Sequence, residues 1–535
     1  MIALQLELIY GRAGTGKSQL CLDEIRQELR NSPDGTPLLL LVPEHATFKL
    51  EKELASTKDL GGFTRAYVMG FRRFAHRVLL ELGGALKPRI SDLGKRLLVH
   101  RILSARESEF SAFARAAKQR NFTETIVNLI EEFKSYRIES AAIYSASQQV
   151  NDVMLKQKLT DLSLIYTDFA DYMDGKYTDA EDCLNLLAEK LSLSSLVRGA
   201  KVWIDGFTWF NPQELAILRQ LLLTAAEVKI TLCIEEIDSS VHQQEVALFH
   251  RQWQTRQDVM QIARELDVHV KEREMSGRYR FAAAEELENL EEKLVTAKKI
   301  QIKSAGKINI VEAANRRKEV EGMAIDMIQK CRELNYRWRD MAVLLRDTEN
   351  YSDLIAHVFS DLEIPFFRDG KRKAVHHPLA EFLRSILDAL QGWRYEPLFR
   401  VLKTGFFSVK RDQIDKVENY VLMYGVQGKK WQEEWQFGKG ANFTEEALAE
   451  INAIRKTLIV PLNALQEKLK SCQTVSEYTD ALYDTLESME IPEQLITLAD
   501  QAQADGQLAE AREYEQLWNL IINLFDQLVE TCGEE

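Results

Sequence analysis

A glycine-rich segment at residues 11–18, GRAGTGKS, constrains the fold of this 535-residue chain more than any other feature. An apolar run at residues 4–10 precedes it, and a helix-like run at residues 19–29 follows it. Glycines between a strand and a helix allow backbone N–H groups to close around phosphate oxygens, and the helix N-terminus adds positive potential there. The segment therefore predicts an α/β fold in which a strand leads into a phosphate-binding loop.

The residue types in this loop predict a nucleotide as its ligand. Lys17 is expected to reach the terminal phosphates, and Ser18 to coordinate Mg²⁺. The alternative interpretation is a glycine-rich turn without a ligand. The predicted nucleotide-binding residues are Gly11, Arg12, Ala13, Gly14, Thr15, Gly16, Lys17 and Ser18.

Length and composition indicate a folded chain with several cores. Hydrophobic residues make up 45% and charged residues 28% of the sequence, and the length predicts about two to four domains. No apolar run approaches the roughly 20 residues of a membrane helix, and residues 1–10 lack the basic start and cleavage site of a signal peptide. We therefore expect a cytoplasmic protein without a membrane partner.

Cysteine spacing and net charge exclude two simple classes of protein. The six cysteines are scattered without a C-x-x-C pair, so a zinc site or iron–sulfur cluster built from this chain alone is not expected. The formal net charge is -13, so nucleic-acid binding would have to come from local basic surfaces.

Strand-like and helix-like segments alternate in two blocks. Strands are expected at residues 38–42, 66–69, 201–205 and 228–234, with helices over residues 92–198 and 243–297. A linker at residues 298–307 leads to a second unit, in which strands are expected at residues 308–311, 341–345 and 364–367. Residues from 376 onward are helical in pattern. Two α/β units with helical blocks suggest a two-lobed P-loop architecture.

The carboxylates needed for hydrolysis are only partly present. Asp205 ends a predicted strand and is the second expected Mg²⁺ ligand beside Ser18. Gly206 follows where a helicase would carry Glu, and Glu214 is better interpreted as a helix cap opposite Asn211. A Gly-Asp-x-x-Gln element is absent after residues 228–234, and only ten residues precede Gly11 to grip a base. We therefore predict nucleotide binding with little hydrolysis and name no catalytic residue.

Several short segments, taken in order, resemble the AddB subunits of AddAB-type bacterial helicase–nucleases. The matching segments are residues 10–18, 41–48, 69–75, 204–207, 312–317, 343–346, 364–367 and 376–379. The resemblance implies a superfamily 1 helicase-like fold with two RecA-like lobes, large helical insertions and a decayed motor. The implied divisions are a first lobe (1–90 and 199–297), a helical insertion (91–198), a partial second lobe (298–392) and a second helical insertion (393–535).

The resemblance also implies a function in recombinational repair of double-strand breaks. An AddA-like partner would carry the motor in a heterodimer, and this chain would bind ATP and Mg²⁺ and scan single-stranded DNA, unwound from duplex DNA, for the hotspot sequence Chi. The nuclease domain and its iron–sulfur cluster belong to the full-length subunit. Because the chain stops at Glu535, we expect an N-terminal half without nuclease activity.

Candidate DNA contacts follow three of the predicted strands. Arginines and aromatic side chains at residues 71–77 could bind a strand, or could form an amphipathic helix with Phe71, Phe74 and Val78 in the core. The resemblance favours DNA contact, although His45 and His76 stand where the family more often has Gln and Trp. Trp209 or Phe210 is expected to be exposed toward a strand. The predicted DNA-binding residues are His45, Thr47, Phe71, Arg73, His76, Phe207 and Phe210.

Three other functions compete with a DNA-scanning subunit. An autonomous P-loop ATPase or helicase would show vigorous DNA-stimulated hydrolysis. A structural scaffold with a relic loop would bind neither nucleotide nor DNA. A small-molecule kinase would need neither the length nor the helical blocks of this chain.

Overall fold

In this computed structural model, the chain is described over residues 5–58, 60, 62–83, 87–235, 247–296, 306–368, 377–440 and 442–533. It divides into two compact units. The larger unit falls within Met1–Arg12, Lys17–Met275 and Ala374–Glu535, and the smaller within Ala13–Gly16 and Ser276–Lys373.

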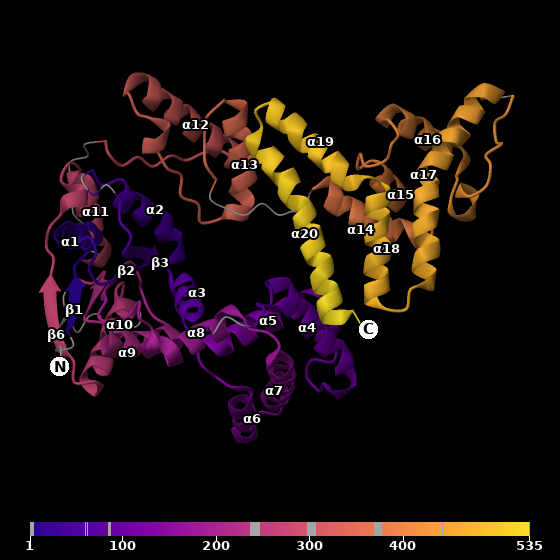
Figure 1. The fold of residues 1–535 in the computed structure, drawn as a ribbon. Coiled ribbons are helices and arrows are strands. Elements are labelled where there is room, and N and C mark those ends of the chain that lie inside the picture. The colour runs from indigo at the N-terminus through magenta and orange to yellow at the C-terminus, as the bar shows by residue number, and fades with distance from the viewer. Residues whose placement is uncertain are drawn as a thin grey trace. The chain divides into compact units, whose positions relative to one another are not determined.

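A six-stranded sheet organises the larger unit (Figure 1), with strand order β3-β2-β4-β5-β1-β6. Its strands are β1 (Gln5–Tyr10), β2 (Leu38–Leu41), β3 (Ala66–Met69), β4 (Lys201–Ile204), β5 (Glu227–Leu232) and β6 (His269–Glu274). Every pairing is parallel, so the carboxyl ends of all the strands lie at one edge of the sheet. The five strands predicted from apolar runs are confirmed.

Helices on the sheet explain why those runs are continuous rather than alternating. Helices α1 (Lys17–Asn31) and α2 (Glu44–Ala55) share a hydrophobic core with Leu38, Leu40 and Trp203 on one face of the sheet. Leu39 and Leu41 point to the opposite face and are fully buried there as well. A parallel strand buried on both faces needs apolar residues at every position.

Strand β6 corrects the expectation that residues 243–297 are entirely helical. The structure has α10 (His250–Glu265), β6, the 3₁₀ helix η5 (Tyr279–Phe281) and α11 (Glu285–Thr296) in this region. The sequence of β6, HVKERE, is polar and largely exposed, and Lys271 pairs with Glu7 of β1. Because β6 is an edge strand whose side chains are largely exposed, it carries no apolar run by which it could be predicted.

Between β3 and β4 the chain forms helices with a core of their own. Ile102, Ile130, Ile165 and Phe169 are among the buried residues of this core. The α-helices from β3 to β5 are α3 (Phe71–Glu81), α4 (Asp92–Ala105), α5 (Arg120–Ser135), α6 (Ser140–Gln149), α7 (Val153–Met173), α8 (Ala180–Lys190) and α9 (Pro212–Thr224). The 3₁₀ helices there are η1 (Glu107–Glu109), η2 (Ala116–Lys118) and η3 (Leu191–Leu193).

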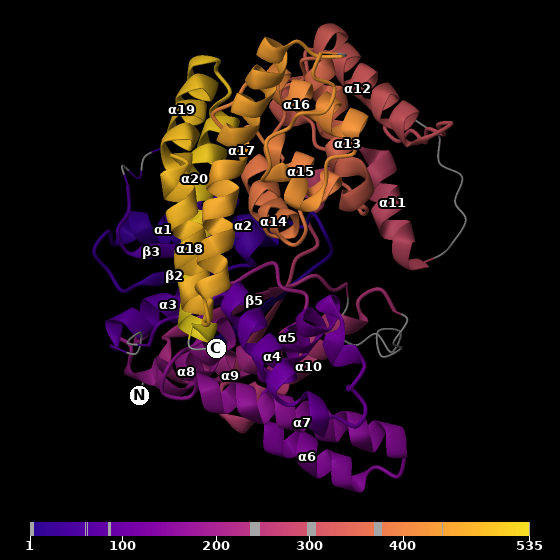
Figure 2. The same cartoon turned by 90° about the vertical axis from the view of Figure 1, so that its right-hand side faces the viewer.

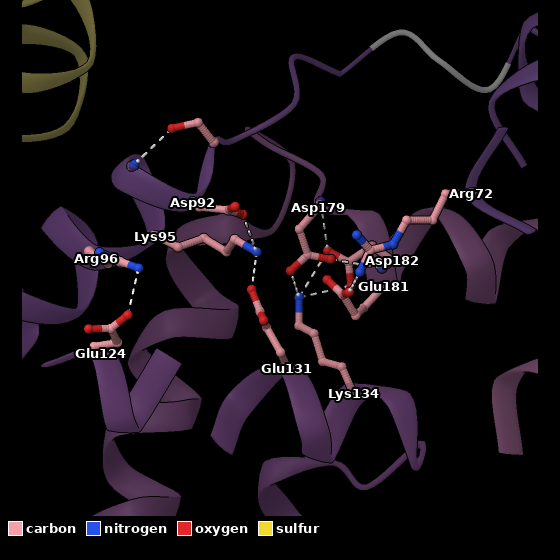
Figure 3. A network of polar contacts seen from close by, with 12 residues as sticks. Arg72, Asp92, Lys95, Arg96, Glu124, Glu131, Lys134, Asp179, Glu181 and Asp182 are labelled. Carbon is pink, nitrogen blue, oxygen red and sulfur yellow. Dashed lines mark hydrogen bonds and ion pairs between the residues drawn. The ribbon is translucent and has the colours of Figure 1, made fainter. Parts of the chain in front are cut away.

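Buried ion pairs join α5 to the start of α8 (Figure 3). Lys134 Nζ lies 2.6 Å from Asp179 Oδ2 and 2.9 Å from Asp182 Oδ1, and the Lys134 and Asp179 side chains are 8% and 1% exposed. Burial alone would raise the pKa of Asp179, but the Lys134 charge and hydrogen bond hold that pKa below its ordinary value. Asp179 also caps α8, so one carboxylate serves both helices.

The C-terminal residues are helical, as predicted, and form a bundle (Figure 2). Its core includes Phe382, Leu458 and two tryptophans, Trp431 and Trp435. The elements are α14 (Pro378–Leu390), α15 (Tyr395–Leu402), α16 (Arg411–Tyr424), η8 (Gly428–Trp431), α17 (Glu445–Ser471), α18 (Val475–Ser488), α19 (Ile491–Ala504) and α20 (Leu508–Cys532).

The smaller unit corrects the expectation of a second sheet. It contains α12 (Arg316–Glu333), η6 (Trp338–Asp340) and α13 (Thr348–Asp361), while residues 308–311, 341–345 and 364–367 form no strands. Val343 packs against these helices, but Ile310 and Leu344 are 97% and 92% exposed. A strand needs a hydrogen-bonded neighbour, and the described residues of this unit supply none. The predicted linker lies mostly outside the described residues, as does residue 376.

The buried pairs of Lys134 give the first prediction. We expect Lys134→Met to lower the free energy of unfolding by about 3 kcal/mol, because Asp179 would remain buried without its cation. Lys118→Met is the matched control, since Lys118 pairs with Glu107 at the surface and its loss should cost less than about 1 kcal/mol. Urea unfolding of both variants measures the difference, and equal losses would contradict the assigned role.

Candidate functional site

The glycine-rich loop follows β1 and ends where α1 begins. Gly14 and Gly16 have φ angles of +82° and +87°, a left-handed conformation that glycine adopts without strain. Lys17 Nζ donates hydrogen bonds to the carbonyl oxygens of Gly11 at 2.6 Å and Arg12 at 2.7 Å. The lysine therefore reaches back across the loop that it follows. Ser18 is exposed in the first turn of α1.

Arg12 anchors this loop to the segment after β5. Its guanidinium lies 3.0 Å from Glu235 Oε1, and its side chain is 13% exposed. The guanidinium carbon also lies 6.0 Å from the centre of the Phe249 ring. An arginine held by these contacts fixes the course of the loop as it leaves β1.

Asp205 follows β4, which is separated from β1 by β5 alone. The side chain is 5% exposed, and Thr231 Oγ1 of β5 donates a hydrogen bond to Asp205 Oδ1. The Asp205 N–H donates to the Leu41 carbonyl at 3.0 Å. Asp205 thus stands at the same edge of the sheet as the loop, one strand away, and its position is fixed by both neighbouring strands.

The backbone itself disfavours a second carboxylate after Asp205. Gly206 has a φ angle of +83°, and an added Cβ would lie 3.4 Å from Pro43 Cδ. Glu in this place would adopt a strained conformation. Glu214 and Asn211 form a reciprocal capping box at the start of α9, as predicted, with N···O distances of 2.8 and 2.9 Å. Burial raises the pKa of the Glu214 carboxyl.

Sequence analysis misses a segment that packs on the loop. The Arg280 N–H donates to the Gly14 carbonyl at 3.4 Å. A Cβ on Gly14 would lie 2.9 Å from Arg280 Cβ and 3.1 Å from the Phe281 ring. Tyr279, in the same 3₁₀ helix, is 74% exposed. The available signal was an aromatic–basic–aromatic triplet within a region assigned to helix.

The predicted DNA-binding residues follow three adjacent strands. His45 and Thr47 come after β2, Phe71 and its neighbours after β3, and Phe207 and Phe210 after β4. Since β2 lies between β3 and β4, the three segments leave the sheet side by side at its carboxyl edge. The structure therefore groups residues that are separated by more than 100 positions in the chain.

Two of the predicted aromatic contacts are packed inward. Phe71, Phe207 and Phe210 form one cluster, with ring centroids 5.3 to 6.3 Å apart. Phe71 and Phe210 are each 5% exposed, so neither ring offers a face to a base in this conformation. For Phe71 the amphipathic-helix interpretation accounts for the structure, because Phe74 and Val78 are buried with it.

Other aromatic side chains are exposed nearby in the chain. Trp209 is 43% exposed, so it is the exposed member of the pair considered with Phe210. Phe48, which sequence analysis did not select, is 74% exposed on α2 beside the exposed His45. Thr47 is instead buried, and its hydroxyl donates to the Glu44 carbonyl at 2.8 Å.

Arg73 and His76 line a basic hollow of about 480 Å³ along β3 and α3. Arg72, Arg77 and Arg89 line it as well. Arg77 lies 4.1 Å from the centre of the Tyr67 ring, and Arg72 pairs with Glu181 at 3.2 Å. Arg73 is exposed and makes no ion pair with any described residue. This surface is locally cationic in a chain of net charge -13.

The structure adds observations on cysteines, metals and membranes. All six cysteines are free thiols. Within the described ranges, no group of three or more His, Cys, Asp or Glu side chains is placed to hold a metal ion. None of the described helices combines the length and apolar character needed to cross a bilayer.

Substitution of Glu214 tests whether this residue caps α9 or takes part in hydrolysis. We expect Glu214→Ala to lower the free energy of unfolding by about 1 kcal/mol, because the Asn211 N–H loses its acceptor. Thermal unfolding measures this loss, and nucleotide turnover should be negligible in the wild type and the variant alike. Measurable wild-type turnover that Glu214→Ala abolishes would contradict the capping assignment. Asp205→Asn, which removes the expected Mg²⁺ ligand, is the comparison variant.

Known proteins related to this chain identify its family. A family model described as ADDB, N-terminal matches residues 8–291, more than half of the chain. Subunits B of ATP-dependent helicase/deoxyribonuclease from Desulforamulus reducens, Desulforudis audaxviator and Bacillus thuringiensis are 39%, 40% and 38% identical to it. Each match covers 99% of this chain and 48% of the relative, so the chain spans about half the length of these curated relatives. The chain belongs to the AddB family, with its N-terminal region matched by the family model.

Proposed function

We propose that this chain is the N-terminal part of the B subunit of a heterodimeric ATP-dependent helicase–nuclease that processes DNA double-strand breaks for recombinational repair. In this proposal it binds ATP with Mg²⁺ and scans single-stranded DNA for Chi in the cytoplasm. One observation carries the proposal. The glycine-rich loop and all three DNA-binding segments leave the same carboxyl edge of one parallel sheet, with Asp205 between them.

The nucleotide part of the proposal assigns separate tasks to the loop residues. Loop N–H groups and the N-terminus of α1 would hold phosphate oxygens. Lys17 would exchange the carbonyls of Gly11 and Arg12 for the terminal phosphates. Ser18 and Asp205 are oxygen donors of the kind that Mg²⁺ takes. The ion would neutralise phosphate charge. Gly206 supplies no group to orient an attacking water, so binding would exceed turnover.

The DNA part of the proposal depends on cations at the edge of the sheet. Arg73 is one of the exposed arginines of the hollow beside β3, and His76 lies one helical turn further along α3. A phosphate backbone following this hollow would pass His45 and the exposed ring of Phe48. Phe71 and Phe210 would then support the edge from beneath, and would contact bases only after a local rearrangement.

Membership of the family supports the parts of the proposal that concern the partner subunit and the nuclease activity. The relatives are named subunits B, which supports a complex with a further subunit. We propose an AddA-like subunit that carries the motor. Nuclease chemistry and an iron–sulfur cluster are not assigned to any residue of this chain.

ATP binding tests the nucleotide part of the proposal. We expect Lys17→Ala to weaken ATP–Mg²⁺ binding by at least about tenfold, because the terminal phosphates lose their ammonium partner. Calorimetric titration measures the affinity, and Lys456→Ala, an exposed lysine on α17, is the matched control. Turnover should stay negligible with or without single-stranded DNA. Vigorous DNA-stimulated turnover would instead indicate an autonomous motor.

Strand binding tests the DNA part. We expect Arg73→Ala to weaken binding of a single-stranded oligonucleotide and to reduce the slope of log affinity against log salt by about 0.7, since one phosphate contact is lost. Fluorescence anisotropy across a salt series measures both quantities. Arg512→Ala removes an exposed arginine on α20 and should change neither. An unchanged slope for Arg73→Ala would place the strand elsewhere.

A further inference from the structure

A second hollow, of about 660 Å³, lies in the larger unit and is lined by no residue of the glycine-rich loop. Its walls come from α5, from α8, from the segment after β4 and from α10. Two aromatic side chains line it, Tyr136 and Trp209, which are 45% and 43% exposed. Exposed aromatic rings on the wall of a hollow offer flat surfaces on which a ligand group can stack.

The polar groups of this hollow are predominantly acidic. Four carboxylates line it, from Glu131, Glu132, Glu181 and Asp258, against the single guanidinium of Arg251. A phosphate backbone would be repelled by this charge, whereas a cation would be attracted. The net charge of the side chains that line this hollow is therefore opposite in sign to that of the basic hollow beside β3.

The acidic groups are only partly engaged by the chain itself. Glu131 pairs with Lys95 (Figure 3). Glu132 and Asp258 are exposed, and neither carboxylate forms an ion pair or hydrogen bond with the residues that the structure describes. Two carboxylates of the wall are thus available to a ligand.

Glu181 provides an independent sign of a missing partner. The residue is 6% exposed, and its Oε1 accepts from Arg72 at 3.2 Å, while the buried Oε2 has no hydrogen-bond partner. Burial, together with the charge of Asp179, raises the pKa of this carboxyl. An unsatisfied carboxylate oxygen is costly to bury, and a cation entering the hollow would reduce that cost.

We propose that this hollow binds a basic segment of a partner protein, with an arginine or lysine side chain stacked on Trp209 and Tyr136 and paired with Glu132 and Asp258. The volume exceeds that of one side chain, so it admits a short stretch of polypeptide. Guanidinium groups suit both requirements, since they stack on aromatic rings and pair with carboxylates. Trp209 thereby becomes a protein-binding residue, not a base-stacking one.

This inference goes beyond the nucleotide and DNA roles and is tested separately from them. The probe is a fluorescein-labelled tetra-arginine peptide with blocked termini, titrated with the 535-residue chain and followed by anisotropy. We expect Glu132→Gln/Asp258→Asn and Trp209→Ala each to weaken peptide binding by roughly fivefold or more. ATP binding should be unchanged in these variants, so failure here is distinguishable from failure of the proposed function.

A charge-matched control separates the hollow from the general acidity of the chain. Asp500→Asn/Glu515→Gln removes two exposed carboxylates on α19 and α20 and should leave peptide binding as in the wild type. An equal loss in this control, or no loss in Trp209→Ala, would overturn the proposal. A labelled oligothymidine that binds with an affinity dependent on Trp209 would also overturn it and assign the hollow to DNA.

Discussion

Parallel hydrogen bonding between strands is the constraint on which the other features of this protein depend. Because β1 to β6 all run in one direction, each segment that follows a strand leaves the sheet at the same edge. The glycine-rich loop, Asp205 and the segments carrying His45 and Arg73 are therefore collected along one line. The order of the strands decides where each segment lies along that line. The loop leaves β1, toward the β6 side of the sheet, and the basic hollow lies at β3 on the opposite side.

Parallel pairing also requires long connections, and this chain uses one of them to build a helical core. The connection from β3 to β4 contains α3 to α8, and apolar residues of α4 to α7 form a core of their own. Lys134 and Asp179 hold two of these helices together through a buried charge pair. Such a pair adds orientation more reliably than stability, since desolvation offsets most of its attraction. Glu181 lies beside this pair in the chain, and its buried Oε2 has no hydrogen-bond partner. Burial therefore removes this oxygen from water without an interaction that offsets the desolvation cost.

The nucleotide site that we propose has the features of a binding site more than those of a catalyst. Its loop is held open by glycines in left-handed conformations and fixed through Arg12 and Glu235. Beside Asp205, however, the backbone turns at Gly206 in a conformation that disfavours any other residue. The backbone conformation at residue 206 therefore disfavours the glutamate that would orient an attacking water molecule.

The sequence alone determined the loop and the capping box of Glu214, because both rest on contacts between residues close together in the chain. It also determined five of the strands, because burial on both faces of the sheet leaves a continuous apolar run in each. It also indicated, through family resemblance, which segments lie together. Tertiary structure decided the rest. Phe71 and Phe210 turn inward because they meet each other from segments that follow separate strands, and β6 forms because β1 offers it a backbone edge. The strands expected at residues 308–311 and 341–345 lack such an edge among the described residues and do not form. Pairing and burial depend on distant partners, which a local pattern does not specify.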